Sequence, residues 1–244
     1  MNSLTHLAEF EKILKHYHIS QESRKILDQT DLVILTGLSS SGRNTIIREL
    51  EKGQEYYFIV SDTTRNPRSN NGVLEKDGRE YWFRSEEEML RDLQEGRLLE
   101  AEIIHSQQVS GTSIRELLHA KEMKKIALAD MDIGGAQNVM NASKKAVIAL
   151  VLPPNFSEWL RRMNQRGHMP KEEQRRRLET ARTILKIALE DDRFTLVINH
   201  DHHDSALYID LIAHQPNAID SAHQADGKVV AQQLLADTAN FLAK

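Results

Sequence analysis

The chain has 244 residues and a formal net charge of −4 at pH 7, from 32 basic and 36 acidic side chains. Because it has no cysteine, disulfides and thiolate metal sites are excluded, and the lack of a basic excess argues against a nucleic-acid partner. The longest apolar run, residues 146–152, is too short to cross a bilayer, and the first residues lack the hydrophobic stretch of a signal peptide. These features indicate a cytoplasmic protein without a membrane partner, and they leave its oligomeric state open.

The predicted elements begin with an amphipathic helix, because apolar residues recur every three or four positions over residues 4–17. A second short helix is expected after Ser20, whose hydroxyl can cap it. An apolar run over 31–37 predicts a buried strand, and a helix follows Gly42. Further strands are expected at 56–60, 125–132, 146–152 and 193–201, and further helices at 85–96, 113–125, 155–190 and 228–242. Strands that alternate with helices predict an α/β fold with a mostly parallel sheet.

A glycine-rich turn follows the first of these strands and opens a helix. Its two glycines have the spacing of a P-loop, in which backbone N–H groups and the helix N-terminus bind phosphate oxygens. A serine-rich turn that binds nothing is the alternative. If the turn is a P-loop, the phosphate-binding segment is Gly37, Leu38, Ser39, Ser40, Ser41, Gly42, Arg43, Asn44 and Thr45.

Two residues of this segment differ from the usual lysine followed by serine or threonine. Arg43 keeps a permanent positive charge, but its planar fork differs from a compact ammonium. Asn44 offers a carbonyl oxygen to Mg²⁺, one atom further out than a hydroxyl. Ligands of open α/β sheets bind beyond the carboxyl ends of the strands, where Asp130 and Asp132 also lie. Strand alternation places these two aspartates on one side.

The most specific motif is the octapeptide Ser61–Arg68, which reads Ser-Asp-Thr-Thr-Arg-Asn-Pro-Arg. Two guanidinium forks fixed in such a turn make charge-assisted, bidentate contacts to a phosphate dianion. The octapeptide resembles the GMP-binding signature of the guanylate kinases, and further motifs follow in the family's order from about Leu32 to Asp201. The resemblance implies an α/β, P-loop NTPase-type parallel sheet core with a small GMP-binding lobe, about 61–113, and a helical lid, about 156–190.

The resemblance also assigns roles to single residues. It implies a GMP site in which two arginines and a tyrosine hold the phosphate and the other residues contact guanine: Ser61, Arg65, Arg68, Tyr81, Glu100, Thr112 and Asp130. It implies that lid arginines act with the P-loop arginine in catalysis: Arg43, Arg162, Arg166 and Arg177. ATP would bind the segment from Gly37 to Thr45, with Asn199 on the adenine side, and Asn44 and Asp132 would hold Mg²⁺.

The chain also departs from the family pattern outside the P-loop. Ser110 stands where the family has a phosphate-binding tyrosine, and the spacing from Glu100 to Thr112 is one residue longer than usual. Gly134 replaces a glutamine after the paired aspartates. Ser110, together with Arg43 and Asn44, favours a non-catalytic binding module, whereas the acceptor arginines and the lid arginines favour an enzyme.

The predicted organisation is an N-terminal helical extension (1–30), a guanylate-kinase-like domain (31–200) and a C-terminal extension with a closing helix (201–244). The predicted reaction is transfer of the ATP γ-phosphate to GMP, with Mg²⁺, to give ADP and GDP. One alternative is a catalytically attenuated guanylate-kinase-like module that binds a nucleotide or a partner. Another is a kinase of a different phosphorylated small molecule. The polar run 200–204 is interpreted as a solvated loop rather than a metal site.

Overall fold

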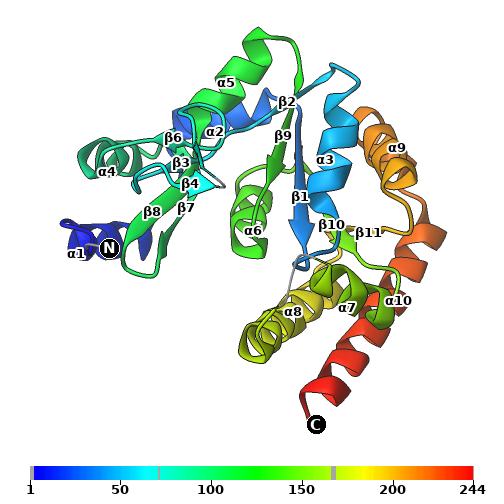
Figure 1. Cartoon of the computed structure of the whole chain (residues 1–244). Coiled ribbons are helices and arrows are strands. Elements are labelled where there is room, and N and C mark those ends of the chain that lie inside the picture. The colour runs from blue at the N-terminus through cyan, green and yellow to red at the C-terminus, as the bar shows by residue number, and fades with distance from the viewer. Residues whose placement is uncertain (1–2, 71, 166–168, 244) are drawn as a thin grey trace. The chain divides into compact units, whose positions relative to one another are not determined.

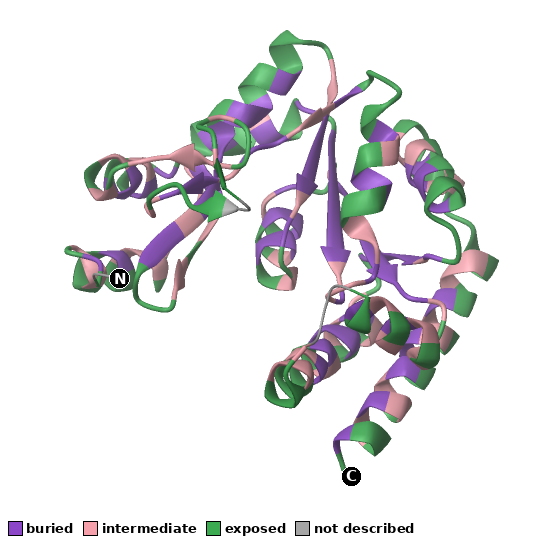
Figure 2. Ribbon diagram, viewed as in Figure 1, coloured by how far each residue is buried: buried purple, intermediate pink, exposed green. Residues whose placement is uncertain are grey.

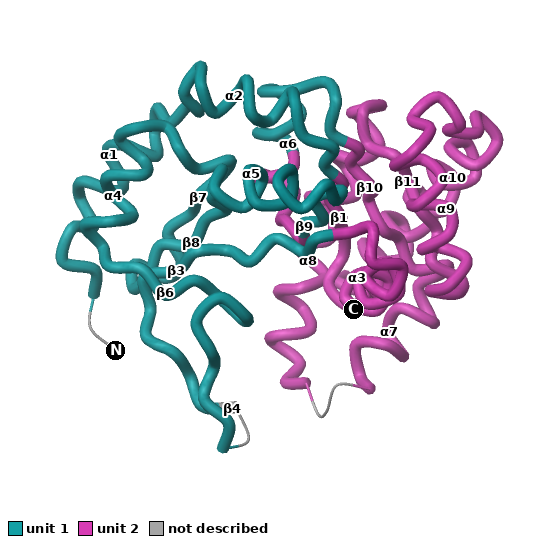
Figure 3. The backbone as a smooth tube through the Cα atoms, turned by 90° about the horizontal axis from the view of Figure 1, so that it is seen from above, with its two compact units in different colours: residues 1–32, 57–129, 137–146 teal, residues 33–56, 130–136, 147–244 magenta. Residues whose placement is uncertain are grey.

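The computed structural model describes residues 3–70, 72–165 and 169–243 (Figure 1). The chain forms two compact units, each assembled from segments that are distant in the sequence (Figure 3). Unit 1 comprises residues 1–32, 57–129 and 137–146, and unit 2 comprises residues 33–56, 130–136 and 147–244. The predicted P-loop and lid therefore belong to unit 2, whereas the predicted GMP lobe belongs to unit 1.

At the core of unit 2, three strands run parallel in the order β11-β10-β1. They are β1 (Leu32–Gly37), β10 (Val147–Leu152) and β11 (Thr195–Ile198). All residues of β10 are buried, as are the first five of β1 (Figure 2). Continuous apolar runs are typical of parallel strands covered on both faces, so the predicted buried strands are confirmed here.

The helices of unit 2 pack around these strands. Helix α10 contacts α8 and β11, and α3 contacts α9. Among the described residues, no helix combines the length and the apolar character needed to span a membrane. The helices of the unit are α3 (Arg43–Glu51), α7 (Phe156–Asn164), α8 (Lys171–Glu190), α9 (His202–His214) and α10 (Ser221–Leu242), with a 3₁₀ turn at Pro216–Ala218, while α6 (Ile133–Ala142) begins in unit 2 and ends in unit 1.

The segment after residue 200 is more helical than its polar sequence suggested. Asp201 caps α9, because its side chain accepts hydrogen bonds from the N–H groups of His203 (2.7 Å) and Asp204 (3.3 Å). The polar run 200–204 is therefore a helix start, and within the described part of the chain it forms no group of closely spaced metal ligands. The closing helix, expected from residue 228, begins earlier, at Ser221.

Unit 1 is built on a four-stranded sheet in the order β6-β3-β8-β7. Strands β7 and β8 form an antiparallel hairpin, β3 is antiparallel to β8, and β6 is parallel to β3. The strands of this sheet are β3 (Asp62–Thr63), β6 (Trp82–Phe83), β7 (Leu98–Ile104) and β8 (Gln108–Ser113). Further elements of the unit are the hairpin β4 (Ser69–Asn70) and β5 (Val73–Leu74), the strands β2 (Tyr56–Phe58) and β9 (Ile126–Asp130), and the helices α4 (Glu86–Gln94) and α5 (Ile114–Glu122).

The N-terminal helices α1 (Leu7–Leu14) and α2 (Gln21–Asp28) pack within unit 1. Helix α1 contacts α4 and β7, and Phe10 of α1 is fully buried in their shared core. The Ser20 hydroxyl accepts a hydrogen bond from the N–H of Ser23 at 3.1 Å, which confirms the predicted cap of α2. The first thirty residues are thus part of a packed unit.

The contact between α10 and β11 can be tested at Gly227. A Cβ atom at this position would lie 2.6 Å from the Cβ of Leu196, so the helix or the strand would have to shift. Alanine favours a helix over glycine by about 1 kcal/mol, but we expect Gly227→Ala to lower the free energy of unfolding by about 1–3 kcal/mol through overpacking. Thermal and denaturant unfolding measure the change. Gly53→Ala is the control, because its Cβ would make only an ordinary 3.5 Å contact, and a stabilised Gly227→Ala would contradict the packing.

Candidate functional site

The predicted P-loop in unit 2 joins β1 to α3 through a turn that requires glycine at both ends. Gly37 has a φ of +132°, and a Cβ there would lie 2.4 Å from the carbonyl oxygen of Val151. Gly42 has a φ of +106°, and a Cβ there would lie 2.2 Å from Nδ2 of Asn199. Both the conformation and the close approach of neighbouring atoms therefore exclude a side chain.

The loop forms one wall of a cavity of about 390 Å³ in unit 2. The rest of the cavity lining comes from two further segments. Helix α8 contributes Thr180, Thr183 and Ile184, and the region that follows β9 contributes Asp132 and Ile133. Helix α3 begins at Arg43, so the positive end of its dipole points to the loop. The cavity thus has the position and the backbone chemistry of a phosphate site.

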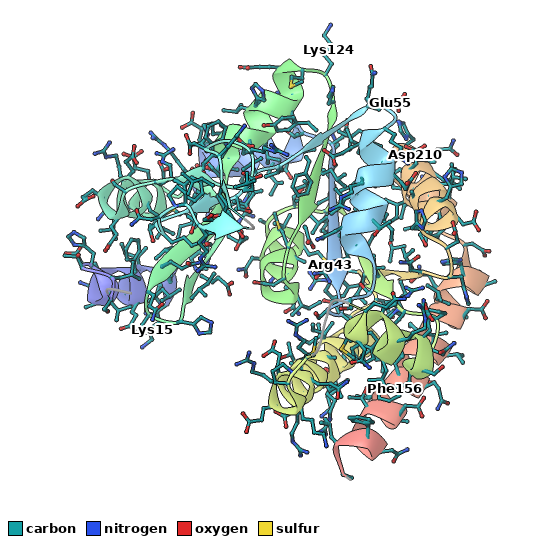
Figure 4. The ribbon with its side chains drawn as sticks, in the orientation of Figure 1. Lys15, Arg43, Glu55, Lys124, Phe156 and Asp210 are labelled. Carbon is teal, nitrogen blue, oxygen red and sulfur yellow. The ribbon has the colours of Figure 1, made fainter. Side chains whose placement is uncertain are left out.

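The Arg43 side chain folds back onto the loop that precedes it (Figure 4). Its Nη1 donates hydrogen bonds to the carbonyl oxygens of Gly37 (2.5 Å) and Leu38 (3.0 Å), and its Nε donates to Oδ1 of Asp130 (2.6 Å). Both partners of the Arg43–Asp130 ion pair are mostly buried, with 21% and 27% of their side chains exposed. Arg43 therefore braces the loop, and Asp130, predicted to contact guanine, is its partner.

Two more loop carbonyls are bonded by side chains from distant segments. The indole Nε1 of Trp159 on α7 donates to the carbonyl oxygen of Ser39 at 2.8 Å. Nδ2 of Asn199 donates to the carbonyl oxygen of Ser41 at 2.7 Å, and the Ser205 hydroxyl donates to Oδ1 of Asn199 at 3.3 Å. Asn199 is only 3% exposed, so its side chain supports the loop from inside the unit.

Of the three predicted lid arginines, the two that the structure describes both bond to the P-loop. Arg162 of α7 donates from Nη1 to the carbonyl oxygen of Ser41 (3.2 Å) and from Nη2 to that of Asn199 (3.0 Å). Arg177 of α8 donates from Nη1 to the hydroxyl of Ser39 (3.1 Å). Arg166, the third predicted lid arginine, lies outside the described residues. The structure therefore brings Arg162 and Arg177 to the same loop as Arg43.

Each described lid arginine is paired with a glutamate one turn earlier on its own helix. Arg162 Nε donates to Glu158 at 2.8 Å, and Arg177 Nε donates to Glu173 at 2.7 Å. Hydrogen bonds from Arg161 and Arg162 lower the pKa of Glu158 to about 2, and those from Arg177 lower the pKa of Glu173. Both carboxylates therefore stay charged at neutral pH and hold the guanidinium groups in place.

The candidate magnesium ligands Asn44 and Asp132 line the same cavity as the loop. Asp132 accepts a hydrogen bond from the N–H of Gly135 at 2.7 Å, which anchors it at the start of α6. Both side chains are exposed and offer oxygen atoms, the ligand type that Mg²⁺ takes alongside water and substrate phosphates. Thr45 instead lines a neighbouring cavity of about 380 Å³, with Arg162 and Asn199.

In unit 1, the two arginines of the octapeptide are joined by a glutamate that the sequence did not single out. Glu75 accepts two hydrogen bonds from Arg65, at 2.5 and 3.0 Å, and a third from the backbone N–H of Arg68 at 2.8 Å. These bonds, above all those from Arg65, lower the pKa of Glu75 to about 2. The Arg65 guanidinium carbon lies 4.7 Å from the centre of the Tyr81 ring, so the structure brings the side chains of Arg65 and Tyr81 together, and Glu75 ties Arg65 to the backbone of Arg68.

The predicted guanine contacts Glu100 and Thr112 face each other across the β7–β8 hairpin. They are directly paired in the register, and the Thr112 hydroxyl donates to Oε1 of Glu100 at 2.7 Å. A register shift between Leu98 and Glu100 accompanies this pairing. That shift lies before Glu100, and the pairing from Glu100–Thr112 to Ile104–Gln108 is regular, so the two residues are opposite each other despite the longer spacing. Ser110, in place of the family's tyrosine, donates instead to the Thr63 hydroxyl at 3.1 Å.

Ser61, the remaining predicted guanine contact of unit 1, is next to a buried hydrogen-bond network that the sequence did not reveal. Its carbonyl oxygen accepts the N–H of Trp82 at 2.9 Å. Glu116, 2% exposed, accepts hydrogen bonds from the N–H of Val60 (3.1 Å), Tyr57 Oη (2.9 Å) and Trp82 Nε1 (3.1 Å). A buried carboxylate with three donors fixes the backbone just before Ser61.

A family model of guanylate kinase matches residues 29–211. The chain belongs to the guanylate kinase family. The guanylate kinase of Rhodococcus jostii (strain RHA1) is 35% identical over 205 residues, which cover 83% of this chain and 96% of that protein. The guanylate kinase of Sus scrofa is 31% identical over 179 residues, which cover 72% of this chain and 87% of that protein. A crystal structure of guanylate kinase from Anaplasma phagocytophilum matches with a TM-score of 0.53 and 24% identity over 79% of this chain and 87% of that one, which shows a shared fold.

The guanylate kinase match contains every predicted site residue, from Gly37 to Asn199. It extends through most of α9, beyond the boundary predicted at residue 200, and it excludes α1, α2 and α10. Glu75 and Glu116 also lie inside the match, although no motif in the sequence pointed to them. The helical pairs Glu158–Arg162 and Glu173–Arg177 had a readable signal, the four-residue spacing of opposite charges.

The support of the P-loop by Asn199 yields a prediction. Asn199→Ala removes the shortest hydrogen bond to the Ser41 carbonyl inside the unit, so we expect the free energy of unfolding to fall by about 1–3 kcal/mol. We also expect weaker binding of ATP, because the loop loses a brace. Denaturant unfolding and calorimetric titration measure both effects. Ser205→Ala leaves the Asn199–Ser41 bond in place and removes the Ser205 hydroxyl's bonds to Asn199 (3.3 Å) and to the carbonyl oxygen of Asp201 (2.8 Å), so it should weaken ATP binding less. Unchanged ATP binding in Asn199→Ala would contradict the brace.

Proposed function

We propose that the chain is a guanylate kinase that transfers the γ-phosphate of ATP to GMP, giving ADP and GDP. The observation that carries this proposal is the orientation of the P-loop backbone. Four of its carbonyl oxygens accept hydrogen bonds from side chains, namely those of Gly37, Leu38, Ser39 and Ser41. These bonds hold the loop in its turn, the Ser41 N–H donates to the carbonyl oxygen of Leu38 at 3.1 Å, and the N–H groups at the start of α3 are the backbone donors that we assign to a phosphate. The loop therefore suits an ATP triphosphate.

On the donor side, we assign the positive charge around the transferred phosphate to Arg43, Arg162, Arg166 and Arg177. Three of these arginines, Arg43, Arg162 and Arg177, bond to the P-loop, which supports this assignment. The residues from Gly37 to Thr45 would bind the ATP phosphates. Asn199 would act on this site through the Ser41 carbonyl, because its amide is buried and bonded there.

Magnesium fits this donor side. Asn44 and Asp132 would hold it, since both present oxygen atoms to the cavity lined by the loop. When bound, the ion would neutralise charge on the triphosphate. The chain's own contribution is to fix the position of Asp132 through the N–H of Gly135 and to keep Asn44 in the first turn of α3.

On the acceptor side, Arg65, Arg68 and Tyr81 would hold the phosphate of GMP, and Ser61, Glu100, Thr112 and Asp130 would contact guanine. The Glu100 carboxylate supports this because it can accept hydrogen bonds from the two adjacent N–H donors on the guanine edge, which adenine does not present. Phosphoryl transfer of this kind depends on positioning and electrostatic stabilisation, so the mechanism requires no side-chain base.

The family relationship does not favour the alternative of an attenuated binding module, and an assay tests it directly. With ATP, Mg²⁺ and GMP, a coupled assay for ADP should report turnover at micromolar enzyme. GMP binding by calorimetry without turnover would overturn the kinase proposal and support the binding module. We also propose a cytoplasmic location, which the absence of cysteine supports.

Guanine recognition is tested at Glu100. We expect Glu100→Ala to lower kcat/KM for GMP by roughly 100-fold, because the guanine edge and the Thr112 hydroxyl both lose their acceptor. Steady-state kinetics at saturating ATP measure the effect. Glu102→Ala is the matched control, two residues along the same face of β7 and exposed. Activity indifferent to Glu100→Ala would point to a kinase of another phosphorylated small molecule.

The unusual P-loop is tested at Arg43 and Asn44. We expect Arg43→Lys to lower kcat/KM for ATP by roughly 10-fold, because one ammonium cannot reproduce the planar set of bonds to Gly37, Leu38 and Asp130. Asn44→Ser and the double variant, measured in the same assay, complete the series. A double variant more active than the natural protein would instead mean that Arg43 and Asn44 attenuate catalysis.

A further inference from the structure

The hairpin that follows the octapeptide returns the chain so that Glu75 lies opposite Arg68. Strands β4 and β5 pair Ser69 with Leu74, and the ladder continues with the N–H of Glu75 donating to the carbonyl oxygen of Arg68 at 2.9 Å. In the reverse direction, the N–H of Arg68 donates to the Glu75 carboxylate at 2.8 Å. Backbone and side chain of Glu75 thus both hold the same turn.

The Glu75 carboxylate also fixes the orientation of the Arg65 guanidinium. Nη1 and Nη2 of Arg65 donate to the two carboxylate oxygens, at 2.5 and 3.0 Å, so the contact is bidentate. Both side chains are nearly buried, with 11% of Arg65 and 8% of Glu75 exposed. Nη1 also donates to the carbonyl oxygen of Asn66 at 3.0 Å. The second edge of the guanidinium, formed by Nε and the other Nη2 hydrogen, makes none of these bonds to Glu75 or Asn66.

Two aromatic rings set the plane of the same guanidinium. Its central carbon lies 4.7 Å from the centre of the Tyr81 ring and 5.6 Å from that of Phe83. The two rings are 6.3 Å apart and tilted by 53°. With the rings on its face and Glu75 on one edge, Arg65 has little freedom to rotate.

We propose that Glu75 is a positioning residue for the acceptor phosphate. It aims the free edge of Arg65 and fixes the turn to Arg68, so that both arginines meet the phosphate of GMP in one preformed arrangement. This inference rests on the proposed function, in which Arg65 and Arg68 bind that phosphate. A prearranged pair loses less conformational entropy on binding than two mobile arginines would.

The opposite role is a competitor: a carboxylate that must leave Arg65 before GMP can bind. The two roles predict opposite signs for Glu75→Gln, which keeps the size of the side chain and removes its charge. A positioning residue predicts that the KM for GMP rises by roughly 10- to 100-fold. A competitor predicts that the KM for GMP falls.

The experiment compares Glu75→Gln and Glu75→Asp with Glu80→Gln in full steady-state kinetics. Glu80 is the matched control, because its carboxylate also accepts a hydrogen bond from a backbone N–H, that of Lys76 at 2.7 Å. It forms an ion pair with Arg79. We expect Glu75→Gln to raise the KM for GMP and to leave the KM for ATP within about twofold of the natural value. The shorter aspartate should give an intermediate loss, and the control should be unaffected. A fall or no change in the KM for GMP overturns the proposal.

A second measurement separates positioning from a loss of folding. In an Arg65→Ala background, Glu75→Gln should raise the KM for GMP by a clearly smaller factor than in the natural protein, because only the bond from the Arg68 N–H to Glu75 remains to be lost. An equal loss in both backgrounds overturns the proposal, since it would mean that Glu75 acts through the fold. Thermal unfolding of each variant accompanies the kinetics.

Calorimetric titration with GMP separates this inference from the proposed function. If the natural protein shows no turnover, the kinase proposal fails, and the Kd for GMP then takes the place of the KM in the same comparison. If the natural protein turns over and the Glu75 variants keep its KM for GMP, the kinase proposal stands and the positioning role is wrong.

Discussion

Pairing between arginine and carboxylate organises both of the regions that we propose to bind phosphate. Four of the arginines assigned to phosphate binding or transfer each have an acidic partner within their own unit: Arg43 with Asp130 at 2.6 Å, Arg65 with Glu75 at 2.5 Å, Arg162 with Glu158 at 2.8 Å and Arg177 with Glu173 at 2.7 Å. Three of these pairs surround one loop, where unpaired guanidinium charges would repel each other in the absence of a nucleotide. The carboxylates reduce that repulsion and fix the direction of each fork. The arginines that we propose as phosphate ligands are therefore held in place before any nucleotide binds.

The same pairing explains how an arginine can stand where P-loops have a lysine. An ammonium is a compact charge on a flexible stem and can follow a phosphate, whereas a guanidinium offers several donors in one plane. Arg43 uses this plane to connect Asp130 with the carbonyl oxygens of Gly37 and Leu38. It acts as part of the loop's frame, and the lid arginines Arg162 and Arg177 bring additional charge to the same loop.

The sequence predicted those features that depend on neighbours in the chain. The buried strands of unit 2 and the cap at Ser20 follow from local patterns. The octapeptide is likewise local, and it is the basis on which we propose Arg65 and Arg68 as phosphate ligands. Glu75 could not be found this way, because it lies ten residues after Arg65 and reaches it only through the β4–β5 hairpin. The buried role of Asn199 was hidden for a similar reason, since its partner Ser41 is 158 residues away.

The region after residue 200 was hard to assign because its helices lack a clear apolar stripe. Apolar residues are spread around α9 and α10, so the periodicity that reveals an amphipathic helix is weak. Their position is fixed by tertiary contacts such as those between α10 and β11. The extra residue between Glu100 and Thr112 illustrates the same limit, because only the register of the hairpin reveals that the two still face each other.

The N-terminal helices are bonded to the start of β7, the strand that carries the proposed guanine contact Glu100, although these helices precede the region shared with the family. The Tyr17 hydroxyl donates to the carbonyl oxygen of Leu98 at 2.6 Å and accepts its N–H at 2.9 Å, and burial raises the pKa of Tyr17 to about 12. The carbonyl oxygen of Gly96 accepts from Ser20 N–H at 3.0 Å and from the Ser23 hydroxyl at 2.7 Å. These bonds clamp the start of β7 two residues before Glu100. The N-terminal extension is therefore part of the framework that holds β7, where we propose the acceptor site.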